Sequence, residues 1–363
     1  MSRSNSALVL TLAVTEDGTI LASGGSQGTR LWDVAHMSEI ERPSGSGVRG
    51  ATLVVIWARQ TEEAHDVLYA GTQNGFFYCW RKKDGIFEET FVIQTPDIGE
   101  ITAMAFDSTN NRLCLCTLQR HSPILGNFQG RIDWEVDADE PIAFAAFDNS
   151  QDRDIIVLGL HNNGPIYTLR GRTGEIASHW SVGARIGDAA FNWRDGVVCL
   201  EDPDSGPALF RLSDQVKSRA YGIERDRAVV RPRKVCFGEQ GTTVVCGSDH
   251  GCVYVFDTRS GQKLATLSVG SAEWVQVVTT AEIDDVSVIA AQMRAMDCSE
   301  EILVWKRAQP VAEKKSHRNM VAWFFKALVV LGCLAFVYQN VEPILKGIRK
   351  DLPETGTNAQ EDA

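Results

Sequence analysis

The amino-acid sequence predicts an all-β fold of seven four-stranded units, followed by a single C-terminal transmembrane helix. Short strands rich in β-branched and aromatic residues recur between turn residues. Similar turn-and-strand segments return about every 45 residues, and no long segment with helical periodicity occurs before residue 315. A lone four-stranded sheet cannot bury both faces, whereas sheets stacked in a ring can. The repeat therefore predicts a seven-bladed β-propeller over residues 1–307.

The repeat is clearest in three segments, GGSQGTRLW (24–32), GTQNGFFYCW (71–80) and GSDHGCVYVF (247–256). Each has a glycine at the end of one strand, then two or three polar residues, a second glycine and a strand that ends in an aromatic residue. GLHNNGPIYTL (159–169) is a further copy, and EILVW (301–305) is the last strand. The residues that mark the seven strand ends lie 41 to 49 positions apart: Trp32, Trp80, Phe128, Leu169, Phe210, Phe256 and Trp305.

Two further series of strands are expected between these marks. The innermost strands are ALVLTLAV, ATLVVIWA, ITAMAF, IAFAAF, IGDAAF, RKVCFG and WVQVVTT. The second strands are TILASG, DVLYAG, RLCLCT, DIIVLG, GVVCLE, TVVCGS and VSVIAA. Their nearly continuous apolar runs are typical of sheets covered on both faces. The sequence does not identify the segment that completes the seventh blade.

The repeats resemble those of WD-repeat β-propellers over about residues 5–307. The first repeat contains a literal Trp-Asp pair, Trp32-Asp33. The aspartate that family members place just before the second glycine is replaced by Gln27, Asn74 and His250. The whole layout is also similar to a group of fungal WD-repeat-like proteins with a C-terminal membrane segment. This resemblance implies the architecture and no activity.

Composition argues against several classes of function. The formal net charge is −11, with 36 Lys and Arg against 47 Asp and Glu, which disfavours a protein that binds nucleic acid through its phosphates. Nine cysteines form no C-x-x-C pair and seven histidines are scattered. We therefore expect reduced intracellular thiols, no metal site, no cofactor and no small-molecule substrate.

Two motifs suggest catalysis or nucleotide binding when they are considered without the segments around them. Gly24 to Gly28 fits the G-x-S-x-G nucleophile elbow around Ser26, but a strand follows where that motif needs a helix. Gly45 to Gly50 fits G-x-G-x-x-G, again with a strand after it. Both are expected to be turns or loops. We expect no enzyme, with a propeller hydrolase as an alternative.

A basic segment stands out in this acidic chain, KSRAYGIERDRAVVRPRK at 217–234. It predicts a positive patch on a long loop between blades, suited to an acidic partner surface or to lipid headgroups. A solvated loop without a partner is the alternative. The candidate partner-binding residues are Arg225, Arg227, Arg231, Arg233 and Lys234.

The C-terminal part of the chain predicts a membrane anchor. A basic linker at 308–319 precedes MVAWFFKALVVLGCLAFVYQNV at 320–341, and a polar tail follows at 342–363. As a helix these 22 residues would span ~33 Å, about the thickness of the bilayer core. Lys326 can reach the headgroups from near one end. The anchor residues expected at the interfaces and in the apolar run are Trp323, Lys326, Leu331, Phe336 and Tyr338. An interfacial helix is the alternative.

Flanking charge predicts the orientation of this anchor. Five Lys and Arg residues precede the helix and three follow it, which puts the propeller in the cytosol. We expect a single-pass, tail-anchored protein of an intracellular membrane, with the endoplasmic reticulum favoured. Its predicted function is a scaffold or adaptor that binds proteins.

One alternative function comes from a similar layout. The exchange factor for the small GTPase of the coat-protein-II vesicle coat also has a cytosolic seven-bladed propeller and a C-terminal membrane helix. Its hallmark is a potassium-binding loop that projects from the N-terminal blade. The equivalent region here, SGGSQGTRLW, is expected to form a tight turn with no room for that loop.

Overall fold

The computed structural model describes residues 8–59, 66–95, 99–118, 123–127, 132–137, 140–159, 163–224, 231–270, 274–283, 286–294 and 300–308. The chain divides into two units, Met1–Ala308 and Gln309–Ala363, and every element described below belongs to the first. The predicted helix at 320–341 and the tail at 342–363 lie outside the described residues, as does the linker from residue 309 onward.

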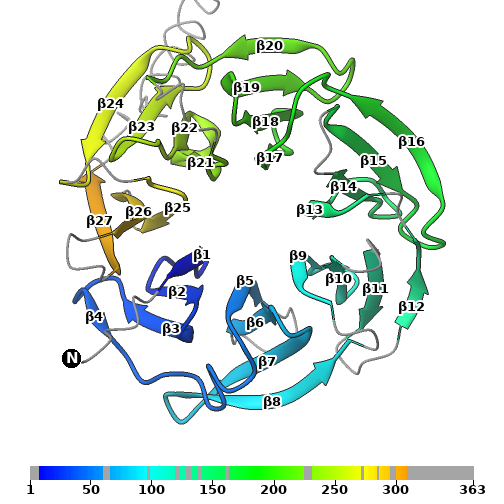
Figure 1. Ribbon diagram of the computed structural model, residues 1–363, viewed down its shortest axis with the longest axis vertical. Coiled ribbons are helices and arrows are strands. Elements are labelled where there is room, and N and C mark those ends of the chain that lie inside the picture. The colour runs from blue at the N-terminus through cyan, green and yellow to red at the C-terminus, as the bar shows by residue number, and fades with distance from the viewer. Residues whose placement is uncertain are drawn as a thin grey trace, which may run out of the picture. The chain divides into compact units, whose positions relative to one another are not determined.

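In the described residues, seven antiparallel sheets follow one another around a ring (Figure 1), and we call each sheet a blade. Blade 1 consists of β1 (Val9–Val14), β2 (Ile20–Gly25), β3 (Gly28–Asp33) and β4 (Ser38–Glu39). Blade 2 consists of β5 (Thr52–Arg59), β6 (Asp66–Thr72), β7 (Phe76–Lys83) and β8 (Ile86–Gln94). Blade 3 consists of β9 (Ile101–Asp107), β10 (Arg112–Thr117), β11 (Pro123–Asn127) and β12 (Ile132–Glu135).

The other blades repeat this order. Blade 4 consists of β13 (Ile142–Phe147), β14 (Ile155–Gly159), β15 (Pro165–Leu169) and β16 (Ile176–Ser181). Blade 5 consists of β17 (Asp188–Asn192), β18 (Val197–Asp202), β19 (Gly206–Arg211) and β20 (Lys217–Ala220). Blade 6 consists of β21 (Val235–Gly238), β22 (Thr243–Cys246), β23 (Cys252–Asp257) and β24 (Lys263–Ser268), with a 3₁₀ turn η1 (Glu239–Gly241) after β21. Blade 7 consists of β25 (Val278–Ile283), β26 (Val286–Arg294) and β27 (Glu300–Ala308).

The prediction of a seven-bladed all-β ring is confirmed. Every expected innermost and second strand overlaps a strand in the structure. Six of the seven residues that mark strand ends lie in the third strands, and Phe128 lies just outside the described residues, one position after β11.

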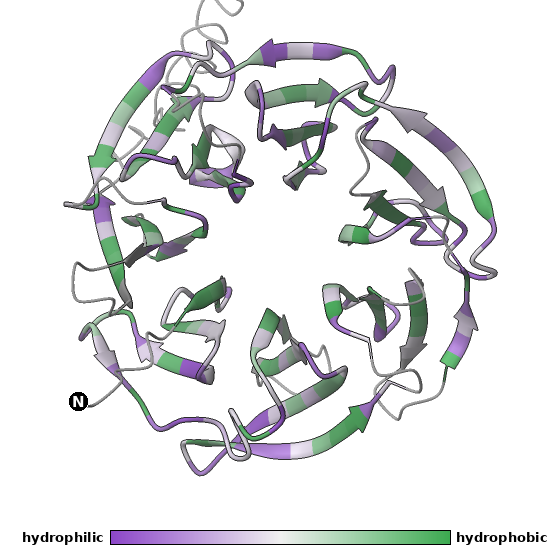
Figure 2. Ribbon diagram, in the orientation of Figure 1, coloured by the Kyte–Doolittle hydropathy of each residue, from purple (hydrophilic) through white to green (hydrophobic). Residues whose placement is uncertain are grey.

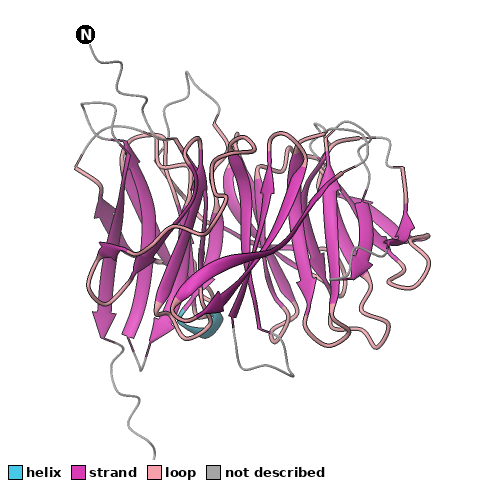
Figure 3. Ribbon diagram, turned by 90° about the horizontal axis from the view of Figure 1, so that it is seen from below, coloured by secondary structure: helices cyan, strands magenta, loops and turns pink. Residues whose placement is uncertain are grey.

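The antiparallel order of the strands gives the ring two faces (Figure 3). In each blade the strands run in chain order from the centre to the rim (Figure 1). The turns between first and second strands and between third and fourth strands therefore share one face, which we call the first face. The turns between second and third strands share the second face with the connections between blades.

The core lies between the blades. Successive side chains of a strand point to opposite faces of its sheet, so one strand contributes to two cores. Leu68 of β6 packs with Ala22 and Leu31 of blade 1, whereas its neighbour Tyr69 packs with Ile101 of blade 3. Hydrophobic residues occupy the inner and middle strands, while the outermost strands are mixed (Figure 2). Burial of such a side chain contributes ~1.5–3 kcal/mol.

The backbone conformation of the turn explains the second glycine of the repeat. It has a positive φ in the tight turns of blades 1, 2 and 6, at Gly28 (81°), Gly75 (73°) and Gly251 (81°). Side chains with a Cβ rarely adopt this backbone conformation. At Gly28 a Cβ would also lie 2.3 Å from the backbone nitrogen of Gly47. The turn that recurs in the sequence therefore depends on glycine.

The ring closes between blade 7 and blade 1 by side-chain packing. Val277 and Val288 pack against Leu12, Leu21 and Val34. The Nζ of Lys306 donates a 2.9 Å hydrogen bond to the carbonyl oxygen of Val34. Within the described residues blade 7 has three strands, and no strand is shared between the first and last blades.

Candidate functional site: the boundary of blades 5 and 6

The basic segment at 217–234 is divided between a strand and a connection. Residues 217–220 form β20, the outermost strand of blade 5, where the sequence predicts a loop. Residues 225–230 lie outside the described residues, so Arg225 and Arg227 stay predictions. Residues 231–234 lead into β21, the innermost strand of blade 6. The described parts of the segment thus lie on the outermost strand of blade 5 and just before the innermost strand of blade 6.

Arg233 is buried, which differs from its predicted place on a surface patch. Its side chain is 1 % exposed and the Glu201 side chain is 0 % exposed. The Nε of Arg233 donates a 2.7 Å hydrogen bond to Glu201 Oε1, and Nη2 donates to the same oxygen. The guanidinium group therefore joins β18 of blade 5 to the start of blade 6, and its charge is satisfied inside the protein.

Lys234 forms a second link between the same blades. Its Nζ lies 2.9 Å from Oδ1 of Asp188, and the backbone N–H of Val235 donates a 2.8 Å hydrogen bond to Oδ2. Asp188 is the first residue of β17 and is buried. Burial raises the pKa of this carboxyl group, although the charge of Lys234 opposes the rise. Lys234 also holds the two blades together.

Arg231 is the remaining predicted cation that the structure describes. Its guanidinium carbon lies 5.4 Å from the ring centre of Trp274, a cation–π distance. Both residues belong to connections that lead into an innermost strand, β21 or β25. The three described residues of the predicted set, Arg231, Arg233 and Lys234, each contact a different partner.

Exposed and half-buried cations lie instead on the rim of blades 5 and 6. Lys217 is exposed on β20, and Arg219 on the same strand donates a 2.7 Å hydrogen bond from Nη1 to the carbonyl oxygen of Ser260. Ser260 lies in the turn between β23 and β24, so this turn brings Arg259 to the same rim. Lys263 is the first residue of β24, and its Nζ lies 3.8 Å from Oε1 of Glu224. We call Lys217, Arg219, Arg259 and Lys263 the rim cations.

The sequence indicates only half of the rim cations. Lys217 and Arg219 belong to the basic segment, whereas Arg259 and Lys263 follow 40 residues later in an ordinary turn. Their proximity depends on β20 lying beside the neighbouring blade. A comparison of the same turn in successive repeats could have brought them together.

A network of side-chain hydrogen bonds lies in the tight turn of blade 6, on the second face. The ring nitrogens of His250 lie 2.7 Å from Asp249 Oδ1 and 2.9 Å from the hydroxyl of Tyr254. Burial raises the pKa of Tyr254 to about 12, so its hydroxyl stays protonated at neutral pH. Ser248 accepts a 2.9 Å hydrogen bond from the N–H of Cys252. These contacts hold the turn in shape.

The two motifs that resemble catalytic or nucleotide sites are turns, as predicted. Ser26 lies between β2 and β3, and its Oγ accepts a 2.8 Å hydrogen bond from the N–H of Leu8. Gly45 to Gly50 lies between β4 and β5, with a strand after it. The exchange-factor alternative needs a loop projecting from blade 1, where only Ser26 and Gln27 separate β2 from β3.

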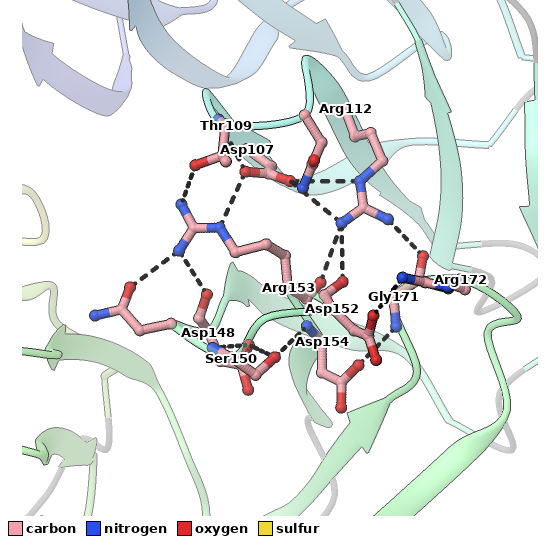
Figure 4. A network of polar contacts seen from close by, with 12 residues as sticks. Asp107, Thr109, Arg112, Asp148, Ser150, Asp152, Arg153, Asp154, Gly171 and Arg172 are labelled. Atoms are coloured by element: carbon pink, nitrogen blue, oxygen red, sulfur yellow. Dashed lines mark hydrogen bonds and ion pairs between the residues drawn. The ribbon is translucent and has the colours of Figure 1, made fainter.

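A second polar cluster joins blades 3 and 4 on the first face (Figure 4). Asp107 is buried at the end of β9, and Arg153 crosses from the turn of blade 4 to donate a 3.1 Å hydrogen bond to its Oδ1. Arg112 contacts Oδ2 of Asp107 and donates a 2.7 Å hydrogen bond to the carbonyl oxygen of Gly171. Burial alone would raise the pKa of Asp107, but the hydrogen bonds from Asn110, Arg153 and Arg112 outweigh it and lower the pKa. The cluster links blades 3 and 4, and we call it the latch.

Neither a metal site nor a membrane-spanning helix occurs in the part of the chain that the structure describes. There, no group of three or more His, Cys, Asp or Glu could hold a metal ion. Among the residues described, no helix is long and apolar enough to cross a membrane. The anchor residues Trp323, Lys326, Leu331, Phe336 and Tyr338 lie outside the described residues.

Fold and surface together define the class of the molecule, a seven-bladed β-propeller with a cationic rim at blades 5 and 6. The ring is consistent with the resemblance to WD-repeat propellers. No protein-family model matches the chain, and no curated protein matches its sequence.

Proposed function

We propose that the protein is a membrane-anchored scaffold that presents its β-propeller to cytosolic partner proteins. The observation that carries the proposal is the group of rim cations on a chain whose net charge is −11. Their positive charge is local, and it lies on the outermost strands of blades 5 and 6 and on the turn before β24, where a partner can reach it. Positive patches of this kind attract acidic surfaces. The partner class we infer is a protein with an acidic docking surface.

The anchor in this proposal is the segment at 320–341. Its apolar composition, with Trp323 and Tyr338 near its ends, supports insertion into a bilayer. The excess of positive charge before it supports a cytosolic propeller on an intracellular membrane, and we favour the endoplasmic reticulum. A scaffold of this kind needs no catalytic group, because it acts by bringing bound partners to one membrane.

Alkaline carbonate extraction tests the anchor. The full chain, with an epitope after Ala363, is expected to stay in the membrane pellet, and protease is expected to leave the epitope intact in sealed membranes. The variant Leu331→Arg places a charge in the apolar run and is expected to move the protein to the supernatant. Release of the wild type by carbonate would contradict the proposed membrane anchor.

Proximity labelling in the same membranes tests the rim cations. Acidic partners labelled by the wild type are expected to be lost from the variant Lys217→Glu/Arg219→Glu. The variant Lys82→Glu/Lys83→Glu makes the same charge change on the exposed end of β7 in blade 2, and is expected to keep them. An identical set of labelled proteins in all three would show that Lys217 and Arg219 bind no acidic partner.

A further inference from the structure

The outer edge of β27 differs from the edges of the other third strands. In blades 1 to 6 the third strand pairs on its outer side with a fourth strand. β27 pairs with β26 along its whole length, from Arg294 opposite Glu300 to Val286 opposite Ala308. No other described strand pairs with it. Its outward N–H and C=O groups can therefore pair with a further strand.

The two faces of β27 are already occupied. Ile302 and Val304 pack in the core that blade 7 shares with blade 1, and Leu303 and Trp305 pack in the core shared with blade 6. Figure 1 accordingly shows β27 at the rim between β24 and β4. The strand is held firmly by its neighbours, and what it offers is a rigid nine-residue edge.

The order of residues along β27 makes this edge complementary to itself. The strand begins with Glu300 and Glu301, has four apolar residues in its middle, and continues with Lys306 and Arg307. An antiparallel copy of the strand presents its basic end to this acidic end. Opposite charges across an antiparallel pair stabilise it, and like charges destabilise it.

Two registers satisfy a two-fold axis and also place opposite charges across from each other. Pairing centred on Leu303 places Glu300 opposite Lys306 of the second copy, and pairing centred on Val304 places Glu301 opposite Arg307 of the second copy. Both registers bring apolar residues together in the middle. In either case a charged pair occurs twice, because the axis repeats each contact.

Two other outermost strands show the opposite pattern. β12 would place Asp133 opposite Glu135 of a second copy, and β20 would place Lys217 opposite Arg219. Each has four residues against the nine of β27. Self-pairing is repulsive and short at these edges, whereas at β27 it is attractive and long.

We propose that the outer edge of β27 is a self-association surface at which two copies of the chain pair as antiparallel strands around a two-fold axis. The two blades then form one continuous sheet. Lys306 and Arg307 are held in place by Val34 and Glu239, and the Arg307 side chain is still 57 % exposed. This interface goes beyond the proposed scaffold function and requires neither an acidic partner nor the membrane.

Exchange of charges between the two ends of β27 tests the interface. The full chain in detergent micelles is expected to sediment as a dimer. The variants Glu300→Lys/Glu301→Lys and Lys306→Glu/Arg307→Glu each oppose like charges, and are expected to dimerise about tenfold more weakly or worse. Mixing the two variants restores both pairs and should give a heterodimer. The variant with all four substitutions should form a homodimer again, which shows that the loss is not a folding defect.

Three results would overturn the proposal. They are a monomeric wild type, a dimer that persists in both charge variants, and a failure of the mixed variants to associate. Persistence would assign self-association to another part of the chain, such as residues 309–363.

Cysteine cross-linking gives an independent readout and the register. In the two registers the axis passes through position 303 or 304, where identical residues of the two copies lie close enough for a disulfide. Oxidation should link either Leu303→Cys or Val304→Cys into a covalent dimer, with the wild type as control. Absence of a link at both positions would contradict strand pairing.

Discussion

Glu201 is the buried carboxyl group whose protonation we expect to affect stability near neutral pH. Burial raises its pKa to about 7, although Arg233 opposes the rise. In the unfolded chain the pKa of a glutamate is about 4.3. The folded protein therefore binds this proton more tightly, so the stabilising contribution of Glu201 is full below about pH 4 and declines as the pH rises to about 7.

The variant Glu201→Gln should remove this part of the pH dependence. It keeps the size of the side chain and an acceptor for Arg233, but it cannot titrate. We expect the free energy of unfolding in urea to fall between pH 5 and pH 7.5 for the wild type, with a smaller fall for the variant. The same slope in both proteins would show that Glu201 does not bind a proton in this range.

Asp107 is a buried carboxylate of the opposite kind, because it is ionised and receives two guanidinium groups. Asp107→Ala leaves Arg112 and Arg153 without their shared partner at the boundary of blades 3 and 4. We expect a loss of about 3 kcal/mol in the free energy of unfolding. Asp152→Ala removes only an exposed ion pair with Arg172, and should cost no more than about 0.5 kcal/mol. Equal losses in urea denaturation would contradict the latch.

At the scale of the element, the tight turn of each blade is the feature to test. Gly28→Ala combines a positive φ with a Cβ pressed against Gly47. Gly85→Ala shares the positive φ, but nothing lies within 4 Å of its added Cβ. We expect Gly85→Ala to cost about 1 kcal/mol and Gly28→Ala about 2 kcal/mol or more in thermal unfolding. A larger loss at Gly85 would show that the close approach to Gly47 is unimportant.

Strands were predictable where burial shapes the sequence. β10 and β14 are apolar runs between turn residues, and such runs indicate strands without further context. β20 has the sequence KSRA and faces solvent, so it carries no apolar pattern and resembles a loop. Outermost strands are held by pairing to the strand inside them, and a single sequence does not show that pairing.

The candidate site was predictable only in part, for a related reason. A run of cations normally indicates a solvated surface, because burial of an unpaired charge is costly. Arg233 escapes this rule through Glu201, which lies 32 positions away in another blade. The rim cations are separated along the chain in the same way. Charged residues can be counted along a sequence, but the residues that they contact depend on which blades are neighbours.

At the scale of the whole molecule, the number of blades followed from their spacing. Each blade has about the same length because each must cover its neighbours with a sheet of similar size. The closure of the ring did not follow, since it depends on contacts between blades 7 and 1, which are far apart along the chain. The structure answers that question with packing between blades 7 and 1 and the hydrogen bond from Lys306 to Val34.

This closure has a consequence for synthesis of the protein. The apolar flank of blade 1, with Leu12, Leu21 and Val34, is covered by Val277 and Val288, which lie more than 240 positions after Val34. A ribosome adding ~5–20 residues per second needs about 12–50 s to reach them. During that time blade 1 has its partner on one side only. A chaperone that shields nascent apolar surface would therefore find its longest-lived target at the first blade to emerge.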